Sequence, residues 1–257
     1  TALQPASKGA GADWGESAVW IWKGYRCHWR VLGDPKAPAM VLLHGFGASS
    51  SHWRHNAAPL TKAGYRVYGL DLIGFGRSEQ PGLHPHIRLD NRLWARQLAA
   101  FLEQVVQQPA VLVGNSLGGL TALTTAVFRP EWVTAVVAAP LPDPALMQPL
   151  PRRQPRRLRQ LKRRTVGLLC RLLPLEVIVP LISRTALLRM GLQGAYCRSI
   201  RSDRELHQLI ASPARRRTAA RSLRAMSVGM ALRPRGATAP ALLERLAGHT
   251  QPVPLLL

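Results

Sequence analysis

The feature that most constrains the fold of this chain is a short glycine-rich turn between a predicted strand and a predicted helix. Residues 110–113 (AVLV) form an apolar run of strand length, and residues 117–128 carry apolar side chains at helical spacing. The turn reads Gly114-Asn115-Ser116-Leu117-Gly118-Gly119. A sharp strand-to-helix turn strains its central residue, and small residues two before and two after it relieve the crowding. The pattern predicts that Ser116 stands exposed at the carboxyl end of the strand.

Strands and helices alternate along the first half of the chain. The residue patterns predict a β-hairpin over residues 19–31, strands over 39–43, 65–72, 110–113 and 133–138, and helices over 93–106 and 117–128. This alternation predicts a mostly parallel sheet with helices on both faces, which is an α/β fold. From residue 141 the rhythm changes to Arg-rich helical segments interrupted by proline, and a return to the sheet is expected near residues 253–257.

Two other glycine-containing loops follow predicted strands. His44-Gly45-Phe46-Gly47 ends the first buried strand, where the Phe46 backbone N–H, together with that of Leu117 at the helix amino terminus, is placed to bind a developing oxyanion. Gly45 and Gly47 allow close approach of the backbone, and we interpret His44 as a residue that shapes the loop rather than a base. The loop of residues 71–78 lacks the Gly-Lys-Ser/Thr of a phosphate-binding loop, so we interpret it as structural.

The three loops stand in the order and spacing of the α/β-hydrolase superfamily, which the chain resembles over about residues 18–257. Within the superfamily, the chain is most similar to the cyanobacterial and plastid branch of pheophytinase and chlorophyll dephytylase-like hydrolases. The segments that carry this similarity are HGFGASSSHWRHN, GYRVYGLDLIGFGRSEQP and LVGNSLGG. The resemblance implies a fold core over residues 18–140, a helical cap over 141–235 inserted after the sixth strand, and a return to the core over 236–257. Haloalkane dehalogenases and epoxide hydrolases share the loops but carry Asp where this chain has Ser116, so their chemistry is disfavoured.

The same resemblance exposes missing catalytic partners. The family's acid follows the seventh strand and its histidine the eighth, whereas residues 252–257 resemble the seventh strand with nothing after it, so we expect a chain truncated by one strand. Gly248-His249 precedes that strand and is expected at the wrong end of the sheet. Asp143 follows the sixth strand and is a weak candidate for the acid. A serine without a base is a poor nucleophile, so weak or absent activity is expected.

The charge of the chain is concentrated in the predicted cap. The whole chain carries +22, and residues 141–235 hold 21 Lys and Arg against 4 Asp and Glu. Next to the apolar stretch 165–183 lies a block of eight basic residues: Arg152, Arg153, Arg156, Arg157, Arg159, Lys162, Arg163 and Arg164. Either this block docks peripherally on an anionic membrane or it is a solvated cationic face. Specific nucleic-acid binding is disfavoured because the block contains no aromatic residues and no recognition motif.

The sequence analysis therefore predicts a serine hydrolase that cleaves a carboxylic ester, of an apolar small molecule, through an acyl-enzyme at Ser116. The alternative is a catalytically impaired hydrolase or a binding protein on the same fold. No cofactor and no metal are expected, since no His, Cys and carboxylate cluster has ligand spacing. The absence of an apolar leader and the odd number of cysteines predict a protein that is not secreted, with a cytoplasmic location. The resemblance to the cyanobacterial and plastid branch implies a plastid or thylakoid-associated location as the alternative.

Overall fold

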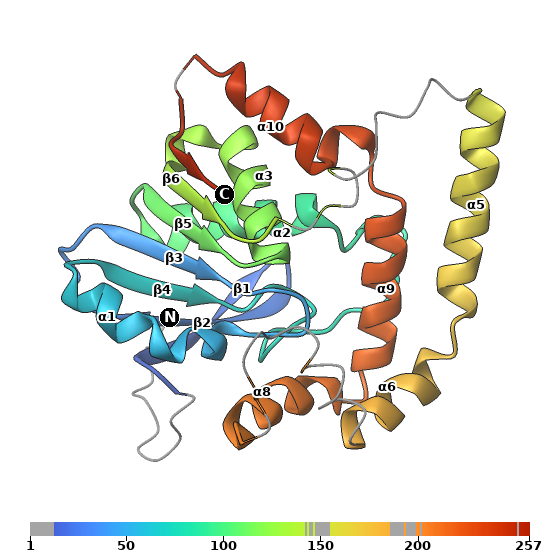
Figure 1. Ribbon diagram of the computed structural model, residues 1–257, viewed down its shortest axis with the longest axis horizontal. Coiled ribbons are helices and arrows are strands. Elements are labelled where there is room, and N and C mark those ends of the chain that lie inside the picture. Colours follow the sequence, from blue (N-terminus) through green and yellow to red (C-terminus); the bar gives the residue numbers. More distant parts are fainter. Residues whose placement is uncertain are drawn as a thin grey trace.

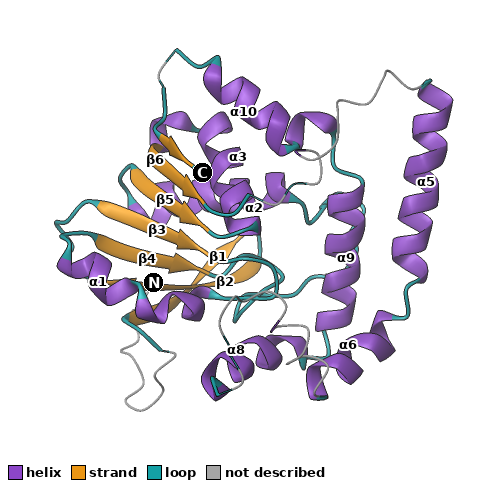
Figure 2. Ribbon diagram, in the orientation of Figure 1, coloured by secondary structure: helices purple, strands orange, loops and turns teal. Residues whose placement is uncertain are grey.

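A seven-stranded mixed sheet lies at the centre of the molecule (Figures 1 and 2). The computed structural model describes residues 13–141, 143, 146, 155–185, 193, 199–200, 202–250 and 252–257. The strand order is β1-β2-β4-β3-β5-β6-β7, with β3 to β7 parallel and β1 and β2 antiparallel at one edge. The strands are β1 (Glu16–Trp22), β2 (Tyr25–Leu32), β3 (Ala39–Leu43), β4 (Arg66–Leu70), β5 (Ala110–Gly114), β6 (Val133–Ala138) and β7 (Leu255–Leu256). The mostly parallel sheet is the α/β architecture that the sequence predicts.

Helices cover both faces of the sheet because side chains in each buried strand alternate between two apolar layers. In β3, Met40 and Leu42 pack with the layer of Ala57 on one face, whereas Val41 and Leu43 join the larger core on the other. The first face carries η1 (Ser50–His55) and α1 (Ala57–Lys62). The second carries α2 (Asn91–Phe101), its π-helical extension η2 (Leu102–Val106), α3 (Leu117–Phe128) and α10 (Ala239–Ala247). Short turns η3 (Pro130–Trp132) and η4 (Arg235–Ala237) precede β6 and α10.

The predicted hairpin is present, and its turn explains the register of β1 and β2. Lys23 and Gly24 both have positive φ, at 51° and 82°, as a two-residue turn that matches the strand twist requires. Trp22 then pairs with Tyr25, and the ladder extends to Glu16 opposite Val31. The predicted strand at residues 252–257 is shorter in the structure, where only Leu255 and Leu256 pair with β6. Prolines at positions 252 and 254 have no N–H to donate to a ladder, which limits the strand.

Four described helices follow β6 and lie at the carboxyl ends of the parallel strands (Figure 1). They are α5 (Arg156–Leu172), α6 (Leu175–Arg184), α8 (Arg204–Ala214) and α9 (Ala219–Ala231), and they fall inside the segment predicted as a cap. Of the predicted basic block, Arg152 and Arg153 lie outside the described residues. The same holds for the side chains of Arg156, Arg159, Lys162 and Arg163.

Partly buried polar contacts fasten α8 and the turn before α9 to η1 and to the loop after β4. Arg54 in η1 has a side chain only 5% exposed, and it pairs with Asp203 at 3.1 Å and with Glu205 at 2.8 Å, both at the start of α8. Arg216 donates to the carbonyl oxygens of Gly76 and Ser78, each at 3.0 Å, in the loop after β4. The cap helices are therefore held over the strand ends where the predicted site residues lie.

Candidate active site

Ser116 occupies the turn between β5 and α3 in a conformation that few side chains adopt. Its φ is 55° and its ψ is −115°, close to the first central position of a type II′ turn, which glycine normally fills. A Cβ on Gly114 would lie 2.3 Å from the carbonyl carbon of Gly118, and a Cβ on Gly118 would lie 2.2 Å from the carbonyl oxygen of Leu43. The flanking glycines thus permit the close crossing of β5, α3 and the β3 loop that strains Ser116.

The loop after β3 lies against this turn. The Asn115 N–H donates to the Leu43 carbonyl at 3.0 Å, and a Cβ on Gly45 would lie 3.3 Å from the Ser116 Cβ. The predicted oxyanion donors, the backbone N–H groups of Phe46 and Leu117, make no hydrogen bond within the described part of the chain. Leu117 is also the first residue of α3, where unpaired N–H groups and the helix dipole favour negative charge. Two unpaired donors beside Ser116 are the arrangement that an oxyanion needs.

His44 is buried, and both of its ring nitrogens are engaged. Nε2 accepts a hydrogen bond from the Leu72 N–H at 3.1 Å, so the proton lies on Nδ1, which donates to the Gly45 carbonyl at 2.8 Å. Burial lowers the pKa of His44, which favours this neutral tautomer. The ring therefore joins the loops after β3 and β4 and has no free nitrogen to take a proton from Ser116.

Asp143, considered as a catalytic acid, is buried and already has two partners. Its Oδ1 accepts from Arg233 at 2.6 Å, and its Oδ2 accepts from the Ala239 N–H at 2.8 Å, at the first residue of α10. The negative charge compensates both the arginine and the positive end of the helix dipole. Asp143 thus links the end of β6 to the segment that leads into α10, and its assignment as the acid stays a prediction.

The structure places His249 away from Ser116. His249 follows α10 and precedes β7, which runs parallel to β6, so it lies toward the amino ends of the strands. Ser116 lies at their carboxyl ends. Among the described residues, the Ser116 Oγ makes no hydrogen bond to a histidine or to a carboxylate.

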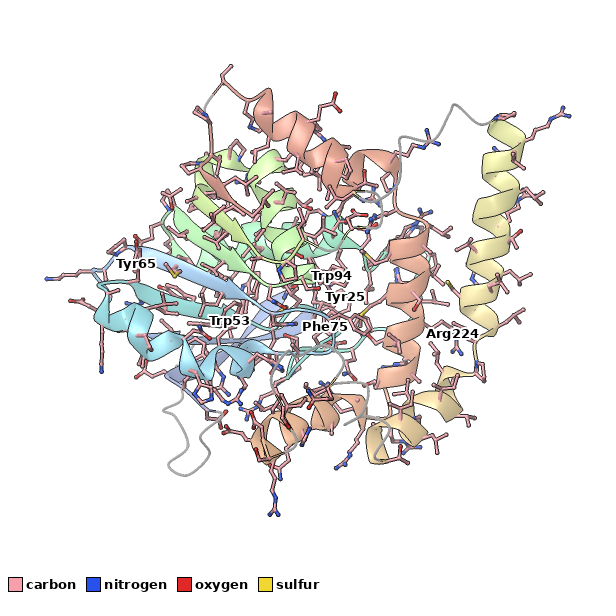
Figure 3. All side chains as sticks on the ribbon, in the orientation of Figure 1. Tyr25, Trp53, Tyr65, Phe75, Trp94 and Arg224 are labelled. Atoms are coloured by element: carbon pink, nitrogen blue, oxygen red, sulfur yellow. The ribbon has the colours of Figure 1, made fainter. Side chains whose placement is uncertain are left out.

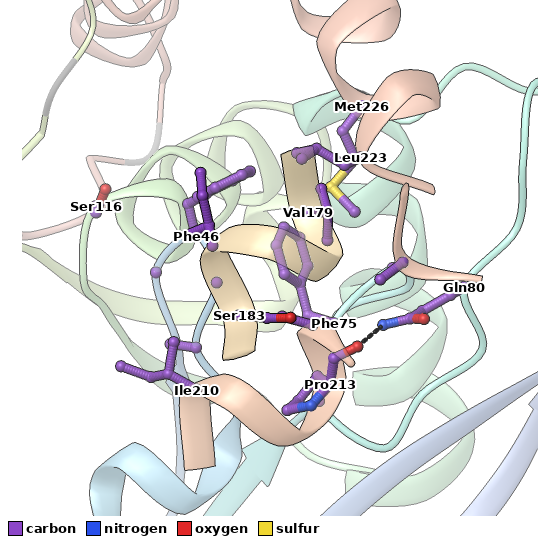
Figure 4. Close-up of a pocket in the computed structure, with 18 of the residues that line it drawn as sticks. Phe46, Phe75, Gln80, Ser116, Val179, Ser183, Ile210, Pro213, Leu223 and Met226 are labelled. Carbon is purple, nitrogen blue, oxygen red and sulfur yellow. Dashed lines mark hydrogen bonds between the residues drawn. The ribbon is translucent and has the colours of Figure 1, made fainter. Parts of the chain in front are cut away.

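A largely apolar cavity of about 710 Å³ opens beside Ser116 (Figure 4). The core contributes residues 45–48 of the loop after β3, with Phe75, Gln80 and Pro140, and the cap helices close the other side. The cap side chains come from the three helices α6, α8 and α9: Leu175, Ile178, Val179, Ile182, Ser183, Ile210, Pro213, Ala214, Ala219, Leu223 and Met226. Gln80 donates to the Pro213 carbonyl at 3.1 Å and accepts from the Thr218 hydroxyl at 2.6 Å, which ties the two walls together. The cavity is suited to an apolar ligand.

His52 is the one histidine among the described residues that line this cavity, and the sequence analysis did not single it out. Burial, with the nearby charge of Arg54, lowers its pKa to about 4. Its Nδ1 is buried and has no hydrogen-bond partner within the described residues. The ring is therefore neutral at pH 7, and a group with so low a pKa is a weak base.

The loop after β4 has the structural role that the sequence predicts. The Asp71 carboxylate accepts from His28 Nδ1 at 2.9 Å, from the Ser50 N–H at 2.6 Å and from the Arg77 N–H at 2.8 Å. Burial alone would raise the pKa of Asp71, but the hydrogen bond and charge of His28, with the hydrogen bond from the Ser50 N–H, hold the pKa well below its usual range. Phe75 of this loop lies close to Trp94 of α2, where the sheet meets the cap (Figure 3).

Comparison with known proteins identifies the fold. The model of the alpha/beta hydrolase fold family matches residues 38–226. The mouse protein "Epoxide hydrolase 4" is 32% identical over 135 residues, which are 52% of this chain and 37% of that protein. The chain spans less than half the length of the curated relatives it matches.

Solved structures agree with the family match at the level of the fold. Cfl2 from Burkholderia cenocepacia has a TM-score of 0.71 and 18% identity, covering 99% of this chain and 81% of that one. The haloalkane dehalogenase DbeA from Bradyrhizobium elkani has a TM-score of 0.65 and 24% identity, covering 93% and 79%. The narrower resemblance to pheophytinase-like hydrolases, and the truncation, stay predictions. No group of three or more metal-ligating side chains occurs within the described residues.

Proposed function

The chain belongs to the α/β-hydrolase fold family, and on that premise we propose that it cleaves a carboxylic ester of an apolar substrate through an acyl-enzyme at Ser116. The observation that carries the proposal is the position of Ser116. It stands in a strained turn, opens into an apolar cavity, and lies beside two backbone N–H groups that make no hydrogen bond within the described residues.

The proposed reaction begins when the Ser116 Oγ attacks the ester carbonyl carbon. The C–O double bond opens to a tetrahedral oxyanion, which the N–H groups of Phe46 and Leu117 bind. The ester C–O bond then breaks, and the alcohol leaves with the proton that Ser116 lost, which water carries to it. The acyl group stays on Ser116 until water attacks the same carbon, which releases the carboxylic acid and restores the serine hydroxyl. The α3 dipole stabilises the oxyanion of acylation and the one that forms when water attacks the acyl-enzyme.

The nucleophile distinguishes this reaction from that of the named relatives. Opening an epoxide or displacing a halide through a covalent intermediate requires a carboxylate nucleophile at the turn, and the resemblance places Asp there in those enzymes. A serine alkoxide instead suits an acyl carbon. The names of the epoxide hydrolase and dehalogenase relatives therefore support hydrolysis, and Ser116 favours esters within it.

The second candidate is a protein that binds an apolar ligand without turning it over. It is favoured by the lack of any described base in contact with the Ser116 Oγ. Without a base the serine stays protonated at pH 7, so both acylation and hydrolysis of the acyl-enzyme are slow. The two candidates differ in whether the acyl carbon reacts with Ser116 at all.

Activated esters supply the test, because a p-nitrophenolate leaving group needs no proton. Hydrolysis of p-nitrophenyl butyrate is measured for the wild-type chain, Ser116→Ala and Ser183→Ala, with and without imidazole as a diffusible base. Ser183 is a matched control, since it lines the same cavity and its hydroxyl donates to the Pro180 carbonyl.

The proposal predicts a slow rate that imidazole raises in the wild-type chain and in Ser183→Ala above the background of Ser116→Ala. Equal rates in all three proteins at every imidazole concentration would contradict esterase chemistry at Ser116. Saturable binding of a non-hydrolysable thioether analogue under those conditions would then support the binding protein.

A further inference from the structure

Helices α5 and α6 expose an unusual number of large apolar side chains. Nine of them, each 38–68% exposed, lie between positions 158 and 182: Leu158, Leu161, Leu168, Leu169, Leu172, Leu173, Val177, Leu181 and Ile182. Single exposed apolar residues are ordinary, but a continuous set on two consecutive helices marks an interaction surface.

The apolar residues of α5 form one stripe that faces away from the molecule. Leu158, Leu161, Leu168, Leu169 and Leu172 fall within an arc roughly 100° wide on a helix of 3.6 residues per turn. The opposite face holds the buried Gly167, where an added Cβ would lie 3.4 Å from Leu232 just beyond α9. Figure 1 shows α9 between α5 and the sheet. The stripe is therefore the outer surface of α5.

Exposed arginines run along one edge of this stripe. Arg157, Arg164 and Arg171 are spaced by seven residues, or about two helical turns, so they lie on the same side of α5. Residues 156–172 contain seven Lys and Arg and no Asp or Glu. A second copy of this helix packed against the stripe would bring like charges together, whereas an anionic surface would complement them.

The corner between the helices is fixed to the rest of the cap. Arg224 of α9 donates to the Leu173 carbonyl at 2.7 Å and to the Glu176 carboxylate at 2.6 Å (Figure 3). The hydrogen bond from Arg224 lowers the pKa of Glu176 to about 2, so the pair stays charged at neutral pH. The stripe of α5 and the outer side of α6 are thus presented together.

Helix α6 is apolar on both sides. Leu175, Ile178 and Val179 line the cavity beside Ser116, while Val177 and Leu181 on the other side are 67% and 55% exposed. Ile182 belongs to both surfaces, since it lines the cavity and is 38% exposed. In Figure 4, Val179 and Ser183 of α6 lie at the pocket that Phe46 and Phe75 line from the core. An apolar path therefore leads around α6 from the outer surface to the cavity.

We propose that the outer faces of α5 and α6 dock on an anionic lipid bilayer, with the apolar stripe inserted among the acyl chains and the flanking arginines at the headgroups. No single described helix is long and apolar enough to cross a membrane, although residues 164–172 and 175–183 together reach that length with a 55° bend. A surface position fits better, because the inner side of α6 is occupied by the cavity. The docking stands independently of ester cleavage. With Ser116 as nucleophile, it would bring a membrane-dissolved ester to the cavity mouth.

The test is vesicle flotation of the full chain, using vesicles of phosphatidylcholine alone and of equal parts phosphatidylcholine and phosphatidylglycerol. The basic variant is Arg157→Gln/Arg164→Gln/Arg171→Gln. Its matched control is Lys36→Gln/Lys62→Gln/Arg96→Gln, which removes the same charge at exposed positions of the sheet region. An apolar variant, Leu161→Ser/Leu168→Ser/Leu172→Ser, probes the stripe itself. Far-UV circular dichroism checks that all variants keep their helices.

The proposal predicts strong recovery with anionic vesicles and weak recovery with neutral ones. The basic variant should bind anionic vesicles on the order of 100-fold more weakly, and the apolar variant more than about tenfold more weakly, while the control binds like the wild-type chain. Equal recovery on both vesicle types overturns the proposal. So does equal loss in the control and basic variants. A dimer in solution that dissociates only in the apolar variant would instead assign the stripe to a second copy of the chain.

Discussion

The strain at Ser116 makes a prediction that separates this residue from any ordinary turn position. Ser116→Gly and Ser116→Ala both remove the hydroxyl, but only alanine keeps the Cβ that disfavours a φ of 55°. A non-glycine residue in such a conformation costs about 1–3 kcal/mol. The greater conformational freedom of glycine in the unfolded chain reduces its stability advantage over alanine by about 0.5–1 kcal/mol. We therefore expect Ser116→Gly to be more stable than Ser116→Ala by about 1 kcal/mol.

A matched pair of variants on a regular helix should show the opposite sign. The pair is Arg96→Gly and Arg96→Ala. Arg96 is exposed in the middle of α2, where glycine is less favourable than alanine by about 1 kcal/mol. The free energy of unfolding is measured for all four variants by urea denaturation followed through tryptophan fluorescence. If Ser116→Ala is as stable as Ser116→Gly, or if the two positions show the same sign, the account of the strained turn is refuted.

Three further predictions concern packing, a buried ion pair and pH. Gly118→Ala should lower the free energy of unfolding, measured by thermal denaturation, by at least about 2 kcal/mol, because the added Cβ would lie 2.2 Å from the Leu43 carbonyl oxygen. Gly236→Ala is the control: an added Cβ there would have nothing within 4 Å, so the free energy of unfolding should change by less than about 0.5 kcal/mol. Asp143→Asn should cost about 3 kcal/mol by leaving the partly buried Arg233 without its counter-charge, and a urea midpoint that does not move would contradict this role. Because the pKa of His52 is lowered from 6.5 to about 4, protonation favours the unfolded chain, so stability is full above pH 6.5 and falls by on the order of 3 kcal/mol toward pH 4. His52→Leu should lose this part of the pH dependence in parallel denaturation curves.

The parts of the site that depend on local sequence could be predicted, and those that depend on distant packing could not. The turn between β5 and α3 could be predicted from a short run in which Gly114 and Gly118 flank Ser116, and α3 begins at the predicted residue. The partner of Asp143, in contrast, is Arg233, which lies 90 residues further along the chain. No periodicity in either segment brings these two side chains together.

The cavity wall shows the same limit. The sequence predicted helical segments and an apolar stretch at residues 165–183, but not that α6 would turn one apolar side toward Ser116 and the other toward solvent. His52 was missed because a lone histidine in a short turn carries no local signal. One feature would have placed His52 near the site: it follows a parallel strand. It lies two residues beyond Ser50, whose buried backbone N–H donates to Asp71.

The central claim is that Ser116 is a nucleophile that can be acylated although no described base activates it. The most direct measurement is the intact mass of the chain after incubation with p-nitrophenyl butyrate, followed by peptide mapping of the adduct. The account predicts slow addition of one butyryl group, on the peptide that contains Ser116, and its absence in Ser116→Ala. An unmodified wild-type chain under conditions that consume the ester, or an adduct of equal yield in Ser116→Ala, would contradict the account.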